Sequence, residues 1–182
     1  MRCAGTVDFC IMHGTLPGPE DQRSLFTAGD YVDQQLFEML KESYPQSHFT
    51  LNLARKFKEE YGFVGNSGDK VIVEVPIAGK FVKHDITAEI RRACECIMPP
   101  IVETIMEMIA RFDPEYQEKV RQNIVIAGGG SRIKGIEDYL KQALKDFADC
   151  SFSCIEDPRF GGANGALALA NEMPEEYWAD MK

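Results

Sequence analysis

The sequence has no long apolar run and no excess of basic residues. Charged residues interrupt each apolar stretch before it reaches the ~18 to 20 uncharged residues of a membrane-spanning helix. Lys and Arg number 20 against 29 Asp and Glu, which gives a formal charge of −9. This is the opposite of the basic surface that neutralises nucleic-acid phosphates. We therefore predict a cytoplasmic chain with no direct membrane span and no nucleic-acid partner.

Cysteine and histidine are too few and too scattered for a disulfide framework or a zinc site. Six cysteines are spread over 182 residues. Cys94 and Cys96 lie two apart in a helical pattern, where side chains at that spacing point away from each other, and no histidine follows at zinc-ligand spacing. No metal site is therefore predicted, and the cysteines are expected to be free thiols, with Cys94 acting as a small buried apolar residue.

Strand and helix patterns alternate along the outer parts of the chain. Apolar stretches bounded by turn residues predict strands at 7–12, 24–27, 71–75, 80–83, 123–127 and 151–155. Helical spacing predicts helices at 29–44, 47–61, about 87–112, about 136–144, 163–173 and 174–181. Pro99-Pro100 is expected to kink or split the third helix. The pattern predicts an α/β fold with a small insert of two helices and a hairpin between its outer parts.

The clearest local motif is a triple glycine that follows a short apolar strand. Gly128-Gly129-Gly130 comes directly after Ile124–Ala127. Without a Cβ, the backbone takes positive φ angles and approaches a ligand closely. The stretch lacks the lysine of a Walker P-loop and the spacing of a dinucleotide fingerprint. Local sequence leaves two interpretations open: the floor of a nucleotide site, or a tight strand-to-helix turn with no ligand.

A second motif lies on the helix predicted at 47–61. Phe57 and Tyr61 are four residues apart on one face, and the outer face is charged and includes Lys58 and Glu59. Such a charged face is usually solvated, and contact with a ligand is the alternative.

The order of these segments resembles the second half of the MreB/actin-like ATPase superfamily. The resemblance rests on Ala4–Asp8, Ala28–Asp33, the lysine-glutamate helix, Gly128–Gly130 and Gly162–Ala166. Two stretches, Gly14–Gln22 and Gly128–Ile133, are most similar to the branch of this superfamily that is associated with magnetosomes. It extends through Pro174–Trp178 and so covers nearly the whole chain.

The resemblance implies an actin-like (ribonuclease H-like) second domain, with residues 1–28 and 86–182 forming subdomain IIA and residues 29–85 the inserted subdomain IIB. It also implies ATP with Mg²⁺ as the cofactor of full-length members. The implied nucleotide-binding residues are Gly5, Thr6, Gly29, Lys58, Glu59, Gly128, Gly129, Gly130 and Arg159. Among them, Lys58 and Glu59 are expected to face the adenosine, and the triple glycine to pass beneath it.

The same resemblance implies that important parts are missing. The N-terminal domain, with its phosphate loop and the residue that positions water, has no counterpart in the sequence. Met1 stands where the family has a magnesium-organising aspartate, and Cys3 stands in place of a glycine. Phosphoryl transfer depends on positioning and on metal neutralisation of charge. We therefore assign no catalytic residue, expect the chain alone to be ATPase-deficient, and expect a fragment, a truncated gene or a late start codon.

Three functions, and a non-functional alternative, remain open from the sequence. The chain is part of a cytoskeletal protein whose full-length form binds ATP, polymerises and aligns magnetosomes, with itself, full-length filament subunits and magnetosome-associated proteins as partners. Alternatively, it is a stand-alone half-actin module that binds or caps filaments, or a non-functional remnant. An enzyme of the superfamily such as a sugar kinase is the third, although the sequence shows no resemblance to a sugar site or to a kinase's catalytic aspartate.

Overall fold

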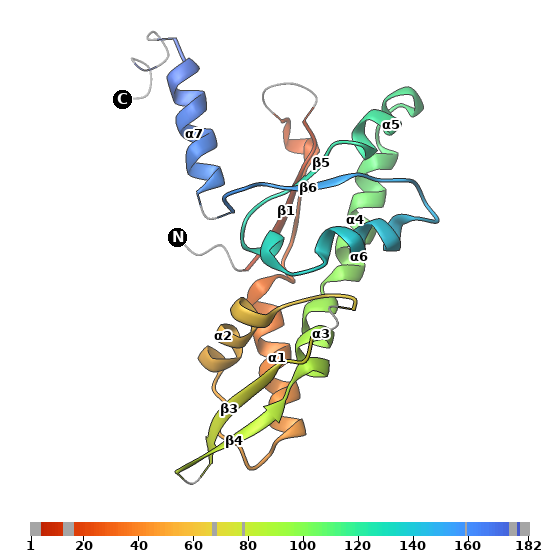
Figure 1. Ribbon diagram of the computed structural model, residues 1–182. Helices are drawn as coiled ribbons and strands as arrows, with labels where there is room; N and C mark the ends of the chain where they lie inside the picture. Colours follow the sequence, from red (N-terminus) through yellow and green to blue (C-terminus); the bar gives the residue numbers. More distant parts are fainter. Residues whose placement is uncertain are drawn as a thin grey trace.

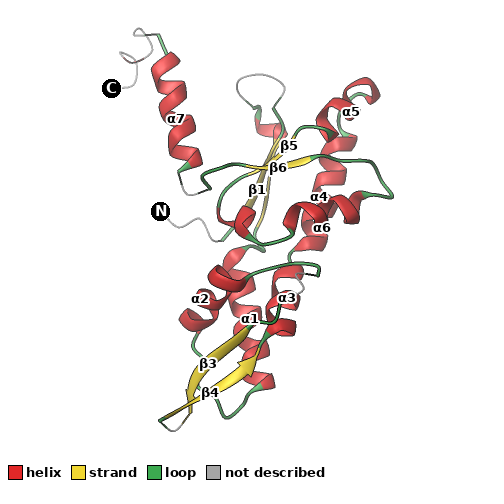
Figure 2. Ribbon diagram, viewed as in Figure 1, coloured by secondary structure: helices red, strands yellow, loops and turns green. Residues whose placement is uncertain are grey.

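The computed structural model describes residues 5–12, 17–66, 69–77, 79–158, 160–174 and 178. Figure 1 shows an upper part, which holds β1, β5 and β6, and a lower part built from α1, α2, α3 and the β3–β4 hairpin. Strands and helices from distant parts of the sequence meet in both parts (Figure 2). The mixed architecture is consistent with the predicted α/β class. No helix in the described ranges is long and apolar enough to cross a membrane.

The upper part contains two separate pairs of strands. β1 (Val7–Cys10) pairs antiparallel with β2 (Gln22–Leu25), and the short helix η1 (Pro19–Asp21) directly precedes β2. β5 (Ile124–Ile126) pairs parallel with β6 (Phe152–Cys154), and α6 (Ile136–Leu144) lies between them in the sequence. Within the described residues, no ladder joins the two pairs.

The lower part is the predicted pair of helices and hairpin. It consists of α1 (Gly29–Ser43), α2 (Leu51–Tyr61), β3 (Ile72–Ile77) and β4 (Lys80–Asp85). α2 begins four residues after the predicted start at Ser47, because Thr50 caps the helix by accepting the Leu53 N–H at 3.2 Å. α3 (Thr87–Glu95) packs against α1 and α2. The division at residues 28/29 and 85/86 remains a prediction.

The expected break near the proline pair is confirmed. α3 ends at Glu95 and α4 (Met98–Ala110) begins three residues later, with Pro99 and Pro100 in its first turn. Proline is tolerated there because the first N–H groups of a helix have no partner within the helix. α5 (Pro114–Arg121) follows α4.

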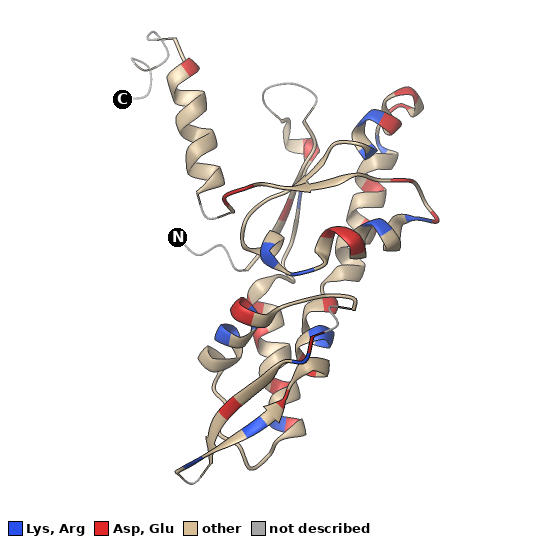
Figure 3. Cartoon of the chain, in the orientation of Figure 1, with Lys and Arg blue, Asp and Glu red and all other residues tan. Residues whose placement is uncertain are grey.

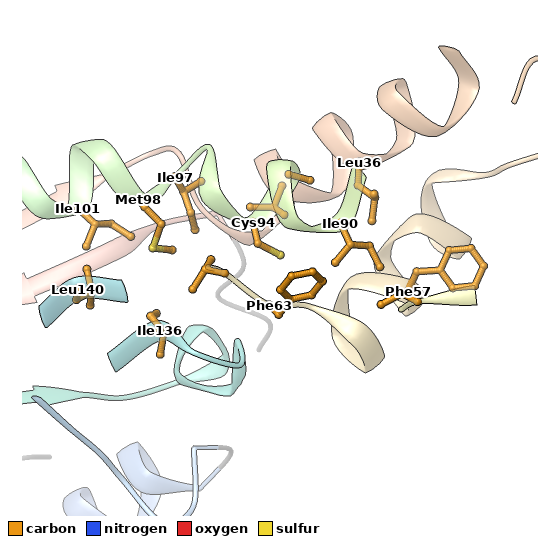
Figure 4. Close-up of a cluster of buried hydrophobic side chains, with 14 of the residues drawn as sticks. Leu36, Phe57, Phe63, Ile90, Cys94, Ile97, Met98, Ile101, Ile136 and Leu140 are labelled. Atoms are coloured by element: carbon orange, nitrogen blue, oxygen red, sulfur yellow. The ribbon is translucent and has the colours of Figure 1, made fainter. Parts of the chain in front are cut away.

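One apolar core runs through both parts of the molecule. Figure 4 shows side chains of α1, α2, α3, α4 and α6 converging on it, including Leu36, Ile90, Met98 and Leu140. The apolar residues at helical spacing in the helix predicted at about 87–112 are buried from Ile90 to Met108, and Phe112 at its end is half-buried. In contrast, α7 (Gly161–Glu172) has no buried residue, and Leu167 and Leu169 are 60% and 44% exposed. In Figure 3, α7 is drawn almost entirely without charged residues.

Burial of Cys94 in this core predicts a loss of stability in alkali. The side chain is 0% exposed, and burial raises the pKa of its thiol to about 12. An unfolded thiol releases its proton near pH 8.5. The folded state therefore holds the proton longer, and its stability is complete below that pH and falls as the pH rises towards 12.

We expect Cys94→Ala to show a smaller loss between pH 8 and pH 10 than the unmodified chain, by about 1 to 2 kcal/mol. Urea unfolding followed by circular dichroism at the two pH values measures this difference. Cys10→Ala, which removes an exposed thiol, is the control and is expected to keep the full loss. Equal losses in all three proteins would contradict the prediction.

Candidate nucleotide-binding site

The triple glycine forms a tight turn at the end of β5. Gly128 has φ +78°, in the left-handed region that favours glycine, and begins the short helix η2 (Gly129–Arg132). The Ser131 hydroxyl and the Ser131 N–H both donate to the Gly128 carbonyl, at 2.8 and 3.2 Å. A Cβ at Gly129 or Gly130 would meet no atom within 4 Å. The chain's own packing therefore leaves open space over the turn, as a ligand floor requires.

Lys58 and Gly29 are brought together at the junction of α1 and α2. The Lys58 ammonium donates to the Gly29 carbonyl at 2.9 Å and lies 2.5 Å from Asp33 Oδ1. Asp33 is completely buried, at 0% exposure. Its other carboxylate oxygen accepts from Arg55 Nε at 2.6 Å. Arg55 also pairs with Asp30 at 2.9 Å.

The contacts of Lys58 with Asp33 and Gly29 limit how its ammonium group can bind a ligand. A buried carboxylate is stable only when it is paired and hydrogen-bonded, so Asp33 holds the lysine in place. Of the three N–H donors of the ammonium group, one is used by the Gly29 carbonyl. The positive charge of Lys58 is already balanced by its ion pair with Asp33. This favours a hydrogen bond to a neutral sugar or base over a contact with phosphate.

Glu59 follows Lys58 on the exposed side of α2. The pKa of the neighbouring Arg55 is raised, mainly by its hydrogen bond to Asp33 and the charge of that carboxylate, with smaller contributions from the charges of Asp30 and Glu59. A solvent-facing carboxylate next to a lysine that can donate suits recognition of ribose hydroxyls.

A short bridge ties α2 to the chain that follows the glycine turn. Phe63 and Lys134 form a parallel bridge. Val64 N donates to the Lys134 carbonyl at 3.0 Å, and Lys134 N donates to the Gly62 carbonyl at 3.1 Å. These bonds fix the C-terminal end of α2 relative to η2.

The stretch Ala4–Asp8, which carries part of the resemblance, is only partly described. Gly5 is exposed, and the Thr6 hydroxyl donates to Asp8 Oδ2 at 2.9 Å. Asp8 also accepts from the Ser24 hydroxyl. The Thr6 proton is therefore used within the chain. Arg159, Met1 and Cys3 lie outside the described residues.

The structure thus joins some of the predicted site residues and leaves others apart. Gly29 and Lys58 are in contact, Glu59 is adjacent, and the triple glycine is tied to the same helix. Thr6 instead bonds to Asp8 on β1, and Gly5 is exposed. The contacts of Asp33 with Lys58 and Arg55 were not predicted, and the available signal was an acidic residue within the buried stripe of α1. In the described part of the chain, no group of three metal-ligating side chains is present.

Comparison with known proteins places the chain among actin-like proteins. The family model described as "MreB/Mbl protein" matches residues 4–175. The chain is 46% identical over 178 residues to the actin-like protein MamK of Paramagnetospirillum magneticum. Among solved structures, a MamK double helical filament is similar at a TM-score of 0.90 and 46% identity, over 94% of this chain and 53% of that chain. A non-polymerising MamK mutant bound to AMPPNP is similar at a TM-score of 0.86 and 46% identity, over 92% of this chain and 52% of that one.

The matched region covers most of this chain but only about half of each relative. It includes 98% of this chain but only 51% of the Paramagnetospirillum MamK, and 49% of the MamK of Magnetospirillum gryphiswaldense. The chain therefore spans about half the length of the curated relatives that it matches.

Proposed function

Because the chain belongs to the MreB/Mbl protein family, we propose that it supplies the adenosine side of an actin-like nucleotide cleft and assembles with filament subunits. The observation that carries this proposal is the open glycine turn at Gly128–Gly130, bridged to the helix on which Lys58 contacts Gly29. The AMPPNP complex of a similar MamK supports a nucleotide as the ligand. The proposed cellular role is in a cytoplasmic cytoskeletal filament that meets magnetosome-associated proteins.

The proposal does not include ATP hydrolysis by this chain alone. A transferred phosphoryl group must be positioned and its charge neutralised from several sides. The residues available here are suited to the sugar and base: Lys58 is balanced by Asp33, and Thr6 is bonded to Asp8. Mg²⁺ and the γ-phosphate would need groups from elsewhere in an assembled cleft.

A second candidate is a module that docks onto filaments without needing nucleotide. The exposed apolar helix α7 favours it, because Leu167 and Leu169 offer surface that another polypeptide would cover. In the β3–β4 hairpin, Ile72 and Phe81 are 54% and 74% exposed. The two candidates differ in whether docking depends on the glycine turn.

Nucleotide binding is tested with a fluorescent ATP analogue and Mg²⁺. We expect weak binding to the purified chain, reduced at least about tenfold (~1.4 kcal/mol) by Gly129→Val. The Cβ of the new side chain meets no atom within 4 Å, and the side chain occupies the space over the turn. Ala110→Val, at the exposed end of α4, is the matched control and is expected to bind normally. Binding that is absent, or that survives Gly129→Val in a folded protein, would overturn the nucleotide proposal.

Filament assembly is tested by sedimentation with preformed MamK filaments. We expect the chain to pellet with them and to show no phosphate release on its own. Co-pelleting by both the unmodified chain and Gly129→Val, without any nucleotide signal, would favour the docking module. A chain that neither binds nucleotide nor pellets with filaments would behave as a remnant.

A further inference from the structure

Cys154, the last residue of β6, contacts three segments that lead into, form or follow the glycine turn. In the parallel ladder it pairs with Ile126, the last residue of β5, from which the chain enters the turn. Its backbone N–H donates to Glu137 Oε1 on α6 at 3.1 Å. Its thiol donates to the carbonyl oxygen of Ser131 in η2 at 3.8 Å. The entry, the middle and the exit of the turn are therefore all tied to this one residue.

The contact with Glu137 depends on the direction of the Cys154 N–H group. The next residue, Ile155, donates its N–H to the Ile126 carbonyl at 3.1 Å and so faces β5. Because successive residues of a strand direct their backbone groups to opposite edges, the Cys154 N–H faces away from β5. Among the described strands, β6 pairs with β5 alone. The Glu137 carboxylate thus supplies an acceptor that a further strand would otherwise provide.

Glu137 is held in place by the start of α6. The helix begins after Gly135, which has φ +80°, and its first residue, Ile136, is 7% exposed within the core. Glu137 and Asp138 both lie in the first turn of the helix, where a negative charge is favourable. Asp138 is exposed, whereas Glu137 is half-buried and in addition reaches Cys154. The two carboxylates share the favourable helix position and differ in this contact.

The carboxylate also keeps the Cys154 thiol in the form that donates. Burial, the hydrogen bond with Glu137 and the charge of Glu137 together raise the pKa of the thiol to about 11. The thiol therefore holds its proton at neutral pH and donates to a carbonyl, which a thiolate cannot do. The N–H and the hydroxyl of Ser131 both donate to the Gly128 carbonyl. A bond to the Ser131 carbonyl thus acts on the short helix that shapes the turn.

We propose that Glu137 and Cys154 are positioning residues for the nucleotide, because Glu137 holds Cys154, and Cys154 holds the glycine turn in the shape that leaves its floor open. The inference rests on the proposed nucleotide site and adds two residues to it, neither of which touches the nucleotide. The contacts close a ring that runs from Ile126 through the turn to Glu137 and back through Cys154. A loop held at both ends samples fewer backbone conformations, so less conformational entropy is lost when a ligand orders it.

The first experiment measures the turn itself and needs no nucleotide. Amide hydrogen exchange of the purified chain is followed by NMR at the N–H groups of Ser131 and Ile133, which donate to carbonyls of the glycine turn. We expect Glu137→Ala to speed exchange at both amides at least about fivefold, as the loss of one hydrogen bond would.

Asp138→Ala is the matched control, since it removes an exposed carboxylate from the same first turn of α6. We expect it to leave the exchange rates of the turn within about twofold of the unmodified chain. The Val32 amide, which donates to the Ala28 carbonyl on α1, reports opening of the other part of the molecule and is expected to stay constant in both variants. Equal acceleration in the two variants, or none in Glu137→Ala, would overturn the positioning role.

The second experiment measures the affinity of the folded variants for the fluorescent ATP analogue with Mg²⁺. We expect Glu137→Ala to bind at least about fivefold more weakly. Glu137→Gln is expected to stay within about twofold, because its amide oxygen still accepts from the Cys154 N–H. A folded Glu137→Ala protein that binds as tightly as the unmodified chain would overturn the inference and leave the proposed function standing. An unmodified chain that binds no nucleotide, with exchange still accelerated in Glu137→Ala, would count against the proposed function alone.

The third experiment tests the thiol and does not require Glu137→Ala to fold. Alkylation of Cys154 by iodoacetamide at pH 9 is followed by mass spectrometry. We expect it to be at least about threefold faster in Glu137→Gln, because loss of the carboxylate charge lowers the pKa of the thiol and raises its thiolate fraction. Asp138→Asn is expected to leave the rate unchanged. Equal rates in Glu137→Gln and the unmodified chain would contradict the contact between Glu137 and the thiol.

Discussion

Asp33→Asn is expected to destabilise the chain by about 3 to 5 kcal/mol, the cost of breaking a buried ion pair by removing one partner. Asp33 is 0% exposed and is held by Lys58 at 2.5 Å and Arg55 at 2.6 Å. A neutral amide would leave the largely buried Lys58 charge without its partner. Urea unfolding followed by circular dichroism measures the change in the free energy of unfolding.

Asp30→Asn is the matched control, since it removes the other carboxylate that contacts Arg55. Asp30 is 54% exposed and its side chain pairs at 2.9 Å. Exposed ion pairs contribute about 0 to 1 kcal/mol, so the control is expected to lose no more than that. Similar losses for the two variants would show that burial of Asp33 does not determine the effect. If Asp33→Asn does not fold, the double variant Asp33→Leu with Lys58→Met removes both charges and is expected to recover folding.

Leu40→Ala is expected to cost about 2 to 5 kcal/mol, because it opens a cavity in the packed core. Leu40 is 0% exposed on α1, the helix that packs against both α2 and α3. Leu51→Ala is its control, since Leu51 is 39% exposed at the start of α2. We expect that variant to lose less than about 1 kcal/mol. Thermal unfolding of both variants, recorded under one condition, makes the comparison. Equal losses would mean that Leu40 is not part of the cooperative core.

Most of the elements could be predicted from local sequence patterns. The apolar spacing on α1 and along 90–112 depends on helical periodicity alone, and the proline pair breaks that second run because of its own backbone chemistry. The boundary at Thr50 was harder to predict, because Pro45 and the polar residues after it suit either a helix start or a loop. The strand near residue 24 lies two residues earlier than its apolar pattern predicted, since pairing with β1 sets its limits.

The candidate site, too, could be predicted only in part from the sequence. Its glycines and the lysine-glutamate pair are visible as motifs, because an unusual backbone needs particular residue types at adjacent positions. The partner of Lys58 is not visible. Asp33 lies 25 residues earlier, and nothing in the intervening chain indicates that α1 and α2 bring the two charges to 2.5 Å.

The sequence by itself determined most of the helices and strands, where the backbone turns tightly, and which superfamily the chain resembles. These properties depend on residues that are neighbours in the chain, so a short window contains the physical cause. Tertiary structure alone decided that Asp33 neutralises Lys58, that the space over Gly129 is open, and that the end of β6 contacts both ends of the glycine turn. Each of these depends on segments that meet only after the chain has folded, when burial sets the energy of a charge and the packing of neighbours sets which surfaces stay uncovered.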